Sequence, residues 1–305
     1  MKKLVSLLLA LCMALCSLTA LAEGAPVTLA DMTGRHVTLD APAARVVAIT
    51  AANVEVLYAL GAGDTLVGRG EYCDYPDAAL AAPVVKSGAE LNVEEVLALE
   101  PDLVIMDTMA QTIEQVEALE NAGLKVIITK EDGIEGVYEA IALIGAAVGK
   151  EDEAAALTGS MQAAFADVAA AAQDSGKTVY FEISPLQWGL WTAGKGTFMD
   201  ELATLCGLTN VFADVDGWAA VSEEQVLERN PDYIVTTSGY YGEGPTPVEE
   251  IMGRDGWGDI GAVKNGRVYN ADSNAISRPG PRLKDAAIEL YHFLNDDEAE
   301  EAPAA

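Results

Sequence analysis

The order of apolar and polar positions predicts short buried strands that alternate with amphipathic helices over most of the chain. Residues 26–39 (PVTLADMTGRHVTL) alternate around Thr33-Gly34, which is typical of a β-hairpin. Beyond the hairpin, short apolar runs predict strands at 45–49, 65–67, 103–106, 125–128, 178–183, 233–237 and 267–270. Helical patterns lie at 53–60, 111–121, 134–148, 198–206 and 281–294. We therefore expect an α/β fold with mainly parallel sheets flanked by helices.

One stretch of this pattern occurs twice. Residues 92–105 read NVEEVLALEPDLVI and residues 222–235 read SEEQVLERNPDYIV, an offset of 130 residues. Each copy opens with a short helix, followed by Pro-Asp and an apolar run suited to a buried strand. Self-similarity at such a long offset favours two similar lobes over a solenoid of short repeats. A cleft between two lobes is the default place for a ligand.

Residues 150–174 interrupt the alternation with an Ala-rich segment that opens on three acids, which suit a helix N-terminus. At 1.5 Å per residue this segment would form a helix of about 36 Å, enough to cross a small domain. Its position midway between the repeats predicts a single long helix that joins the lobes, rather than one more surface helix. The expected division is a first lobe at 23–149, a connecting helix at 150–176, a second lobe at 177–294 and a disordered acidic tail at 295–305.

The N-terminus has the pattern of a secretory signal peptide at residues 1–22. Two lysines precede an apolar stretch that is too short to span a bilayer, and Ala20-Leu21-Ala22 fits a cleavage site. We therefore expect export, to the periplasm or the outer face of the cytoplasmic membrane. A lipid anchor on Cys12 or Cys16 stays open but is not favoured, because leucine precedes both cysteines where a small residue is expected.

Charge and cysteine content narrow the classes of function. The chain carries 48 acids against 18 bases, a formal charge of −30, which disfavours nucleic acid as a partner. The cysteines beyond the signal, Cys73 and Cys206, fall in different predicted lobes, which favours two buried thiols over a disulfide. Its two histidines, His36 and His292, are far apart in sequence, so no metal site built on several imidazoles is expected.

No catalytic motif is complete. Residues 189–196 (GLWTAGKG) approach a P-loop, but Gly196 stands where the magnesium-binding Ser or Thr belongs. A G-x-S-x-G nucleophile motif is absent from the sequence. We assign no catalytic residues and favour ligand binding over catalysis. A two-lobed enzyme or sensor remains the alternative.

Aromatic residues gather in loops and at the ends of predicted strands. Each could be an ordinary packing residue, but together they suit a large flat or amphipathic ligand in an interlobe cleft. The candidates are Tyr72 and Tyr75 in the first lobe, and Trp188, Trp191, Trp218, Tyr240 and Tyr241 in the second.

Arg278 lies in a loop that the sequence stiffens. Residues 277–283 read SRPGPRL, with two prolines that restrict the chain and a glycine that permits a tight turn. A guanidinium held there could pair with a carboxylate, phosphate or catecholate oxygen of a ligand. The alternative is an ordinary surface arginine.

These stretches together resemble the solute-binding proteins of ABC importers for cobalamin, iron–siderophore complexes and haem. The matching pieces are 72–76 (YCDYP), 92–105, 191–198 (WTAGKGTF), 210–213 (NVFA), 218–227 with 230–235, and 278–283. The resemblance implies two α/β lobes joined by one long helix, a ligand in the cleft, and docking onto a membrane permease driven by an ATPase. The ligand would be a metal chelate that carries its own iron or cobalt, so no separate cofactor is expected. We expect an iron–siderophore complex or a corrinoid, with haem as the alternative, and a monomeric protein.

Glu94 and Glu224 occupy the same position in the two copies of the repeat. Both could simply be solvated acids that complement a helix N-terminus. The resemblance implies a second role, in which one exposed carboxylate per lobe meets arginines on the two permease subunits.

Overall fold

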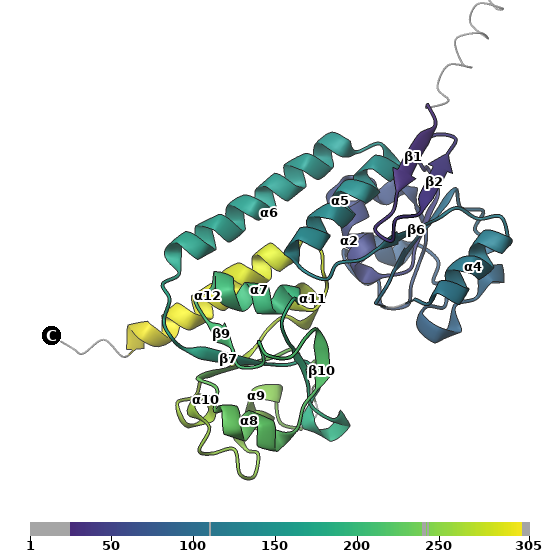
Figure 1. The fold of residues 1–305 in the computed structure, drawn as a ribbon. Coiled ribbons are helices and arrows are strands. Elements are labelled where there is room, and N and C mark those ends of the chain that lie inside the picture. The colour runs from purple at the N-terminus through teal and green to yellow at the C-terminus, as the bar shows by residue number, and fades with distance from the viewer. Residues whose placement is uncertain (1–24, 110, 240–241, 243, 301–305) are drawn as a thin grey trace, which may run out of the picture.

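The computed structural model describes residues 25–109, 111–239, 242 and 244–300, which form two α/β lobes (Figure 1). The expected signal peptide at 1–22 lies outside these residues. The predicted hairpin is confirmed: β1 (Val27–Ala30) pairs antiparallel with β2 (His36–Leu39). Its turn uses Gly34 at a φ of 84°, a left-handed conformation that glycine adopts without steric cost.

The first lobe is built on a sheet of four parallel strands in the order β4-β3-β5-β6. The strands are β3 (Val46–Ala48), β4 (Leu66–Arg69), β5 (Leu103–Asp107) and β6 (Val126–Thr129). The connecting helices are α2 (Ala51–Ala59), α3 (Val93–Leu97), α4 (Ile113–Asn121) and α5 (Ile134–Val148), with 3-10 turns η1 (Gly63–Thr65), η2 (Asp77–Ala81) and η3 (Gly88–Glu90). Every residue of the inner strand β5 is buried, which explains its continuous apolar run.

The second lobe repeats this topology, with the strand order β12-β11-β7-β9. Its parallel strands are β7 (Thr178–Glu182), β9 (Thr209–Asn210), β11 (Tyr233–Thr236) and β12 (Val268–Asn270); β8 (Trp191–Ala193) and β10 (Trp218–Ala220) form a separate antiparallel pair. The helices are α7 (Phe198–Leu205), α8 (Glu223–Arg229), α9 (Pro247–Met252), α10 (Gly261–Lys264), α11 (Ser273–Ile276) and α12 (Leu283–Glu300), with the turn η4 (Leu186–Trp188). In each sheet the lobe's second parallel strand lies outside the first, and the third and fourth follow on the other side. The prediction of two similar lobes is therefore confirmed.

The duplicated stretch makes equivalent hydrogen bonds in both lobes. Asp102 accepts hydrogen bonds from the backbone N–H groups of Ala44 and Arg45, just before β3. Asp232 accepts from the backbone and the hydroxyl of Thr178, at the start of β7. Two residues before each aspartate, Glu100 and Asn230 take a positive φ of 46° and 44°. The repeated Pro-Asp thus ties the start of one strand to its neighbour.

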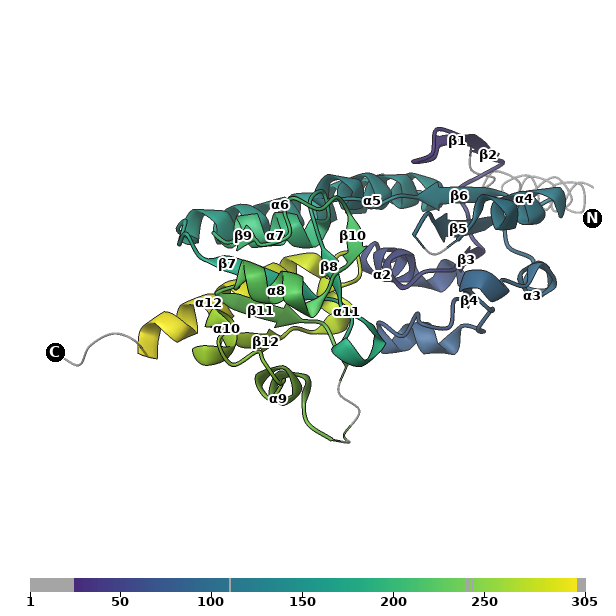
Figure 2. The same cartoon turned by 60° about the horizontal axis from the view of Figure 1, so that its bottom comes forward.

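The long helix is α6 (Glu151–Ala171). It packs against α5 of the first lobe and against α7 and α12 of the second, and runs along both lobes in Figures 1 and 2. Its buried Met161 and Phe165 belong to a core cluster that draws residues from both lobes. The predicted single joining helix is confirmed, although it ends at Ala171, earlier than the sequence pattern suggested.

The C-terminal helix differs from the sequence prediction. We expected a helix to Leu294 and a disordered tail from Asn295, but α12 continues to Glu300. Residues 295–300 (NDDEAE) contain neither proline nor glycine, and the next proline is Pro303, so no strong helix breaker lies in them. No helix in the described part of the chain is long and apolar enough to cross a membrane.

The prediction of two buried thiols is confirmed. Cys73 and Cys206 are both free and buried. Burial raises the pKa of the Cys73 thiol to about 11 and that of Cys206 to about 12. Both therefore stay protonated near neutral pH and behave as small apolar residues.

Candidate functional site

The carboxyl ends of both parallel sheets lead toward one segment, residues 271–282, which joins β12 to α12. This segment follows β12 of the second lobe directly. Its Arg278 donates to the carbonyl oxygen of Tyr72, which follows β4 of the first lobe, at 3.1 Å. Its Gly280 lies against Ala52, at the start of α2 and just after β3. Because ligands of open α/β sheets bind outside the carboxyl ends of the strands, the loops at these ends form the candidate site.

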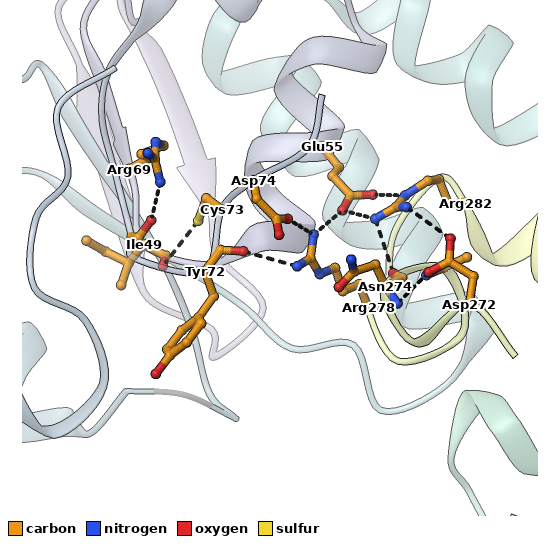
Figure 3. Close-up of polar contacts among 12 residues, drawn as sticks. Ile49, Glu55, Arg69, Tyr72, Cys73, Asp74, Asp272, Asn274, Arg278 and Arg282 are labelled. Atoms are coloured by element: carbon orange, nitrogen blue, oxygen red, sulfur yellow. Dashed lines mark hydrogen bonds and ion pairs between the residues drawn. The ribbon is translucent and has the colours of Figure 1, made fainter. Parts of the chain in front are cut away.

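The loop after β4 in the first lobe exposes two aromatic rings. Tyr72 is 78% exposed, and Figure 3 shows its ring pointing away from the neighbouring arginines. Tyr75 is about half exposed, and the guanidinium of Arg282 lies 4.1 Å from the centre of its ring. Cys73, between the two tyrosines, is completely buried. The buried Cys73 therefore anchors the loop, and an exposed tyrosine lies on either side of it.

Behind this loop, Glu55 of α2 accepts hydrogen bonds from two arginines of segment 271–282 (Figure 3). Arg282 donates to both carboxylate oxygens, at 2.8 and 2.7 Å, and Arg278 donates to one of them at 3.1 Å. The Glu55 side chain is only 2% exposed, and these two arginines are the cations that compensate its burial. The sequence offered a signal that we missed: Glu55 is the one charged residue in the apolar helix AANVEVLYA.

Arg278, for which the sequence left open a ligand contact or an ordinary surface position, pairs with groups of the protein. Besides Glu55 and the Tyr72 carbonyl, it contacts the carboxylate of Asp74 at 2.7 Å. Partial burial raises the pKa of Asp74, but the hydrogen bond and charge of Arg278 outweigh it and hold that pKa below its usual value. These contacts account for the position of Arg278 without a ligand.

The second lobe has a pocket of about 470 Å³ at the carboxyl ends of β7 and β11. Two of its acids share Arg254, which donates to both oxygens of Glu182 at 2.7 and 2.8 Å and to Glu250 at 2.9 Å. Burial raises the pKa of Glu182, although the charge and hydrogen bonds of Arg254 oppose that shift. The remaining wall is Ile183, Ser184, Pro185, Gln187, Trp188, Thr237, Ser238, Gly239, Pro245 and Pro247.

The tryptophans predicted to line the cleft differ in their surroundings. Trp188 lines the pocket and is 74% exposed, on a turn that projects from the second lobe on the side of the first lobe (Figure 2). Trp191 in β8 is about half exposed. Trp218 in β10 is partly buried and packs on Phe198 with ring centres 5.3 Å apart, which is the geometry of a packing residue. Tyr240 and Tyr241 lie outside the described residues.

A second pair of acids, which we did not predict from the sequence, lies where β5 and β6 end. Asp107 and Glu131 are both buried. Burial, followed by the hydrogen bond and charge of Asp107, raises the pKa of Glu131 to about 10. Glu131 is therefore neutral near pH 7. Across the described residues, no group of three or more His, Cys, Asp or Glu side chains is arranged to hold a metal ion.

Glu94 and Glu224 are exposed, each in the first turn of a short helix. The side chain of Asn92 caps α3 by accepting from the backbone N–H of Glu94. Ser222 and Gln225 cap α8 through a reciprocal pair of hydrogen bonds. Both glutamates are exposed, but hydrogen bonds from its own backbone N–H and from the Ser222 side chain lower the pKa of Glu224, so this carboxylate also complements the helix N-terminus.

Comparison with known proteins gives consistent matches. Residues 46–275 match the periplasmic binding protein family. An uncharacterized ABC transporter substrate-binding lipoprotein of Bacillus subtilis is 35% identical over 89% of this chain and 86% of its own. A vitamin B12-binding protein of Salmonella typhimurium is 32% identical over 83% of this chain and 91% of its own. A periplasmic heme-binding protein solved with two hemes superimposes with a TM-score of 0.73 at 26% identity, covering 83% of this chain and 98% of its own.

Proposed function

Because the chain belongs to the periplasmic binding protein family, we propose that it is the extracytoplasmic substrate-binding protein of an ABC importer. We propose further that it captures a corrinoid such as cobalamin between its lobes and delivers it to the permease. The vitamin B12-binding relative supports this choice of ligand class. The corrinoid brings its own cobalt, and no catalytic step is part of the proposal.

The balance of charges in the site is the observation that supports a corrinoid over an anionic ligand. Five carboxylates, those of Glu55, Asp74, Glu182, Glu250 and Asp272, surround three guanidinium groups, those of Arg254, Arg278 and Arg282. A fourth guanidinium, that of Arg69 at the end of β4, is buried and donates to the Gly70 carbonyl. Each of the first three arginines is already paired, so none of them is open for an anionic ligand without leaving a carboxylate unpaired. Haem carries two propionates and many siderophores are anionic, whereas the corrin periphery of cobalamin carries neutral amides. The site therefore favours a ligand with an uncharged rim.

The exposed side chains suit a large ring system. Tyr72 on the first lobe and Trp188 on the second leave most of their surface open to solvent. Such rings give a flat ligand extensive contact at a small cost in conformational entropy. Tyr72, Tyr75, Trp188 and Trp191 are therefore the proposed ligand contacts, while Trp218 is assigned to packing.

Haem is the second candidate, because a heme-binding structure shares this fold. Two exposed side chains that follow first-lobe strands, Tyr72 and Met109, carry a phenol and a thioether that could ligate iron. The propionates would still need cations, which is why haem ranks below a corrinoid.

The permease is the proposed macromolecular partner. Glu94 and Glu224 face solvent at the same position in both copies of the repeat, so they fit a pair of basic sites on a twofold transporter. One molecule of the protein would reach both basic sites of the transporter, so we propose that it docks as a monomer. Export through the signal at 1–22 would place the protein outside the cytoplasmic membrane.

Tryptophan emission tests the ligand directly. Cyanocobalamin absorbs visible light, so its binding near Trp188 should quench emission in a saturable way, and hemin serves as the competitor. We expect saturation by cyanocobalamin at micromolar or lower concentration and little displacement by hemin. Saturation by hemin without any effect of cyanocobalamin would replace the corrinoid with haem.

A further inference from the structure

We propose that Arg278 and Arg282 are positioning residues, which hold the tyrosine loop of the first lobe (residues 70–76) from the second half of the chain. They act through Glu55, Asp74 and Tyr75 and do not touch the ligand. Only the identity of the ligand that the loop contacts rests on the proposed function.

The contacts of Arg278 all lead to the first lobe. Its guanidinium joins Glu55 of α2 to Asp74 and to the Tyr72 carbonyl, both in the loop. One arginine thus bonds the loop backbone next to the exposed Tyr72 ring and the helix behind it. A ligand that used this guanidinium would have to displace one of these bonds.

Arg282 ties the same carboxylate to the second lobe. It donates to both oxygens of Glu55 and lies over the Tyr75 ring. It also donates to the Asn274 carbonyl and lies 3.7 Å from the Asp272 carboxylate, both just after β12. Glu55 is therefore the shared anchor, with the loop on one side and the carboxyl end of the second sheet on the other (Figure 3).

The tyrosine loop has little backbone support of its own. From residue 71 to residue 75, the one backbone–backbone hydrogen bond seen among the described residues runs from Cys73 N–H to the Gly70 carbonyl. Burial of Cys73 holds the middle of the loop, but the tyrosines on either side depend on side-chain contacts. The two arginines supply these contacts, and they keep their geometry only while the lobes keep their relative position.

The relative position of the lobes is thereby coupled to the shape of the tyrosine loop. This loop is the first lobe's half of the candidate site, which we call its half-site. If the lobes separate, both arginines move with segment 271–282 and the loop loses its bonds at Tyr72, Asp74 and Tyr75. The loop would then sample conformations that no longer present the tyrosines to a ligand. A merely stabilising ion pair would not have this selective effect on residues 70–76.

Hydrogen–deuterium exchange of the ligand-free protein tests the positioning role. The variants are Arg278→Gln and Asp74→Asn, and the control is Asp214→Asn. Asp74 is 52% exposed, so replacing it frees the loop without burying an unpaired charge. Asp214 is similarly exposed and pairs with two nitrogens of Arg229 within the second lobe.

Exchange of the hydrogen-bonded amides of the loop, those of Gly70 and Cys73, should rise about 10- to 100-fold in Arg278→Gln and about tenfold in Asp74→Asn, with other segments unchanged. The control should leave these amides unchanged. Unchanged exchange of these amides in Asp74→Asn would overturn the proposal, even if Arg278→Gln fails to fold.

Cyanocobalamin titration of the same proteins separates the two proposals. We expect affinity to fall about tenfold in Asp74→Asn, mainly through faster dissociation, and to stay constant in the control. If the wild-type protein does not bind cyanocobalamin but exchange rises as expected, the ligand assignment fails and the positioning role stands. If Arg278→Gln weakens binding of an anionic corrinoid alone, with unchanged exchange, Arg278 touches the ligand and the positioning role is wrong.

Discussion

The two lobes hold the arginines of their half-sites in different ways. In the second lobe, Arg254 is satisfied inside the lobe by Glu182 and Glu250, and its side chain is only 3% exposed. In the first lobe, the corresponding support for the tyrosine loop comes from Arg278 and Arg282, which belong to the other half of the chain. One half-site is therefore complete within its own fold, while the other depends on how the lobes sit together. A change in the relative position of the lobes would therefore alter the loops of the first lobe and leave the pairs of Arg254 intact.

Arg254→Met should have the largest effect on stability. It leaves Glu182 buried without its partner, which typically costs about 3–5 kcal/mol of unfolding free energy. Arg278→Met should cost clearly less, because Arg282 remains on Glu55. Urea unfolding measures both. Lys86→Met, which breaks an exposed pair with Glu90, should leave the unfolding free energy nearly unchanged. Equal losses for Arg254→Met and Arg278→Met would contradict the comparison.

A rise in pH from 5 to 8 should destabilise the folded protein through Glu131 of the first lobe. Its pKa is raised to about 10 in the folded protein, against 4.5 for an ordinary glutamate, so its contribution is fully present below pH 4.5 and is lost as pH rises toward 10. Glu131→Gln removes this ionisation. Relative to wild type, the variant should gain about 2–4 kcal/mol of unfolding free energy between pH 5 and pH 8. A difference between the two proteins that does not change with pH would rule out the buried, neutral acid.

Trp188→Ala should cost ligand affinity without costing stability. Its side chain is mostly exposed, so its removal leaves no cavity, while loss of a ligand-contacting ring costs about 1–3 kcal/mol of binding free energy. Trp218→Ala is the matched control, because that ring packs on Phe198 and should lower the melting temperature with little change in affinity. Cyanocobalamin titration and thermal unfolding of both variants give the two readouts. If Trp218→Ala weakens binding and Trp188→Ala lowers the melting temperature instead, Trp218 is the ligand contact and Trp188 is the packing residue.

Charge reversal of the repeat acids should have the smallest effect on the isolated protein. Glu94→Arg with Glu224→Arg changes two solvated side chains, so unfolding free energy and ligand affinity should stay unchanged. Docking onto the permease and uptake by cells should be lost, because two attractive charge pairs become repulsive. Normal uptake by the double variant would remove the docking role from both glutamates.

The fold could be predicted from the sequence because its signals are local. The apolar runs around β5 and β11, the Pro-Asp repeat and the uninterrupted helix α6 each appear in a few neighbouring residues. The ion pairs of the site are not local. Glu55 and Arg282 are 227 residues apart, and Glu182 and Arg254 are 72 apart, with no periodicity that links them. The sequence therefore indicated that Arg278 is a cation held in a rigid loop. It did not indicate which carboxylates form ion pairs with it.

A calorimetric titration of corrinoids with amide and with carboxylate rims tests whether the site favours an uncharged ligand. Cyanocobalamin and cobinamide carry amides on the corrin rim, whereas cobyrinic acid carries carboxylates in their place. Cobinamide is the matched control, because it lacks the nucleotide as cobyrinic acid does. If the site favours an uncharged rim, cyanocobalamin should bind with micromolar or tighter affinity, and cobyrinic acid at least about 100-fold more weakly than cobinamide, since like charges near the site cost several kcal/mol. Equal or tighter binding of the carboxylate form, or tight binding of hemin with none of cyanocobalamin, would contradict the account.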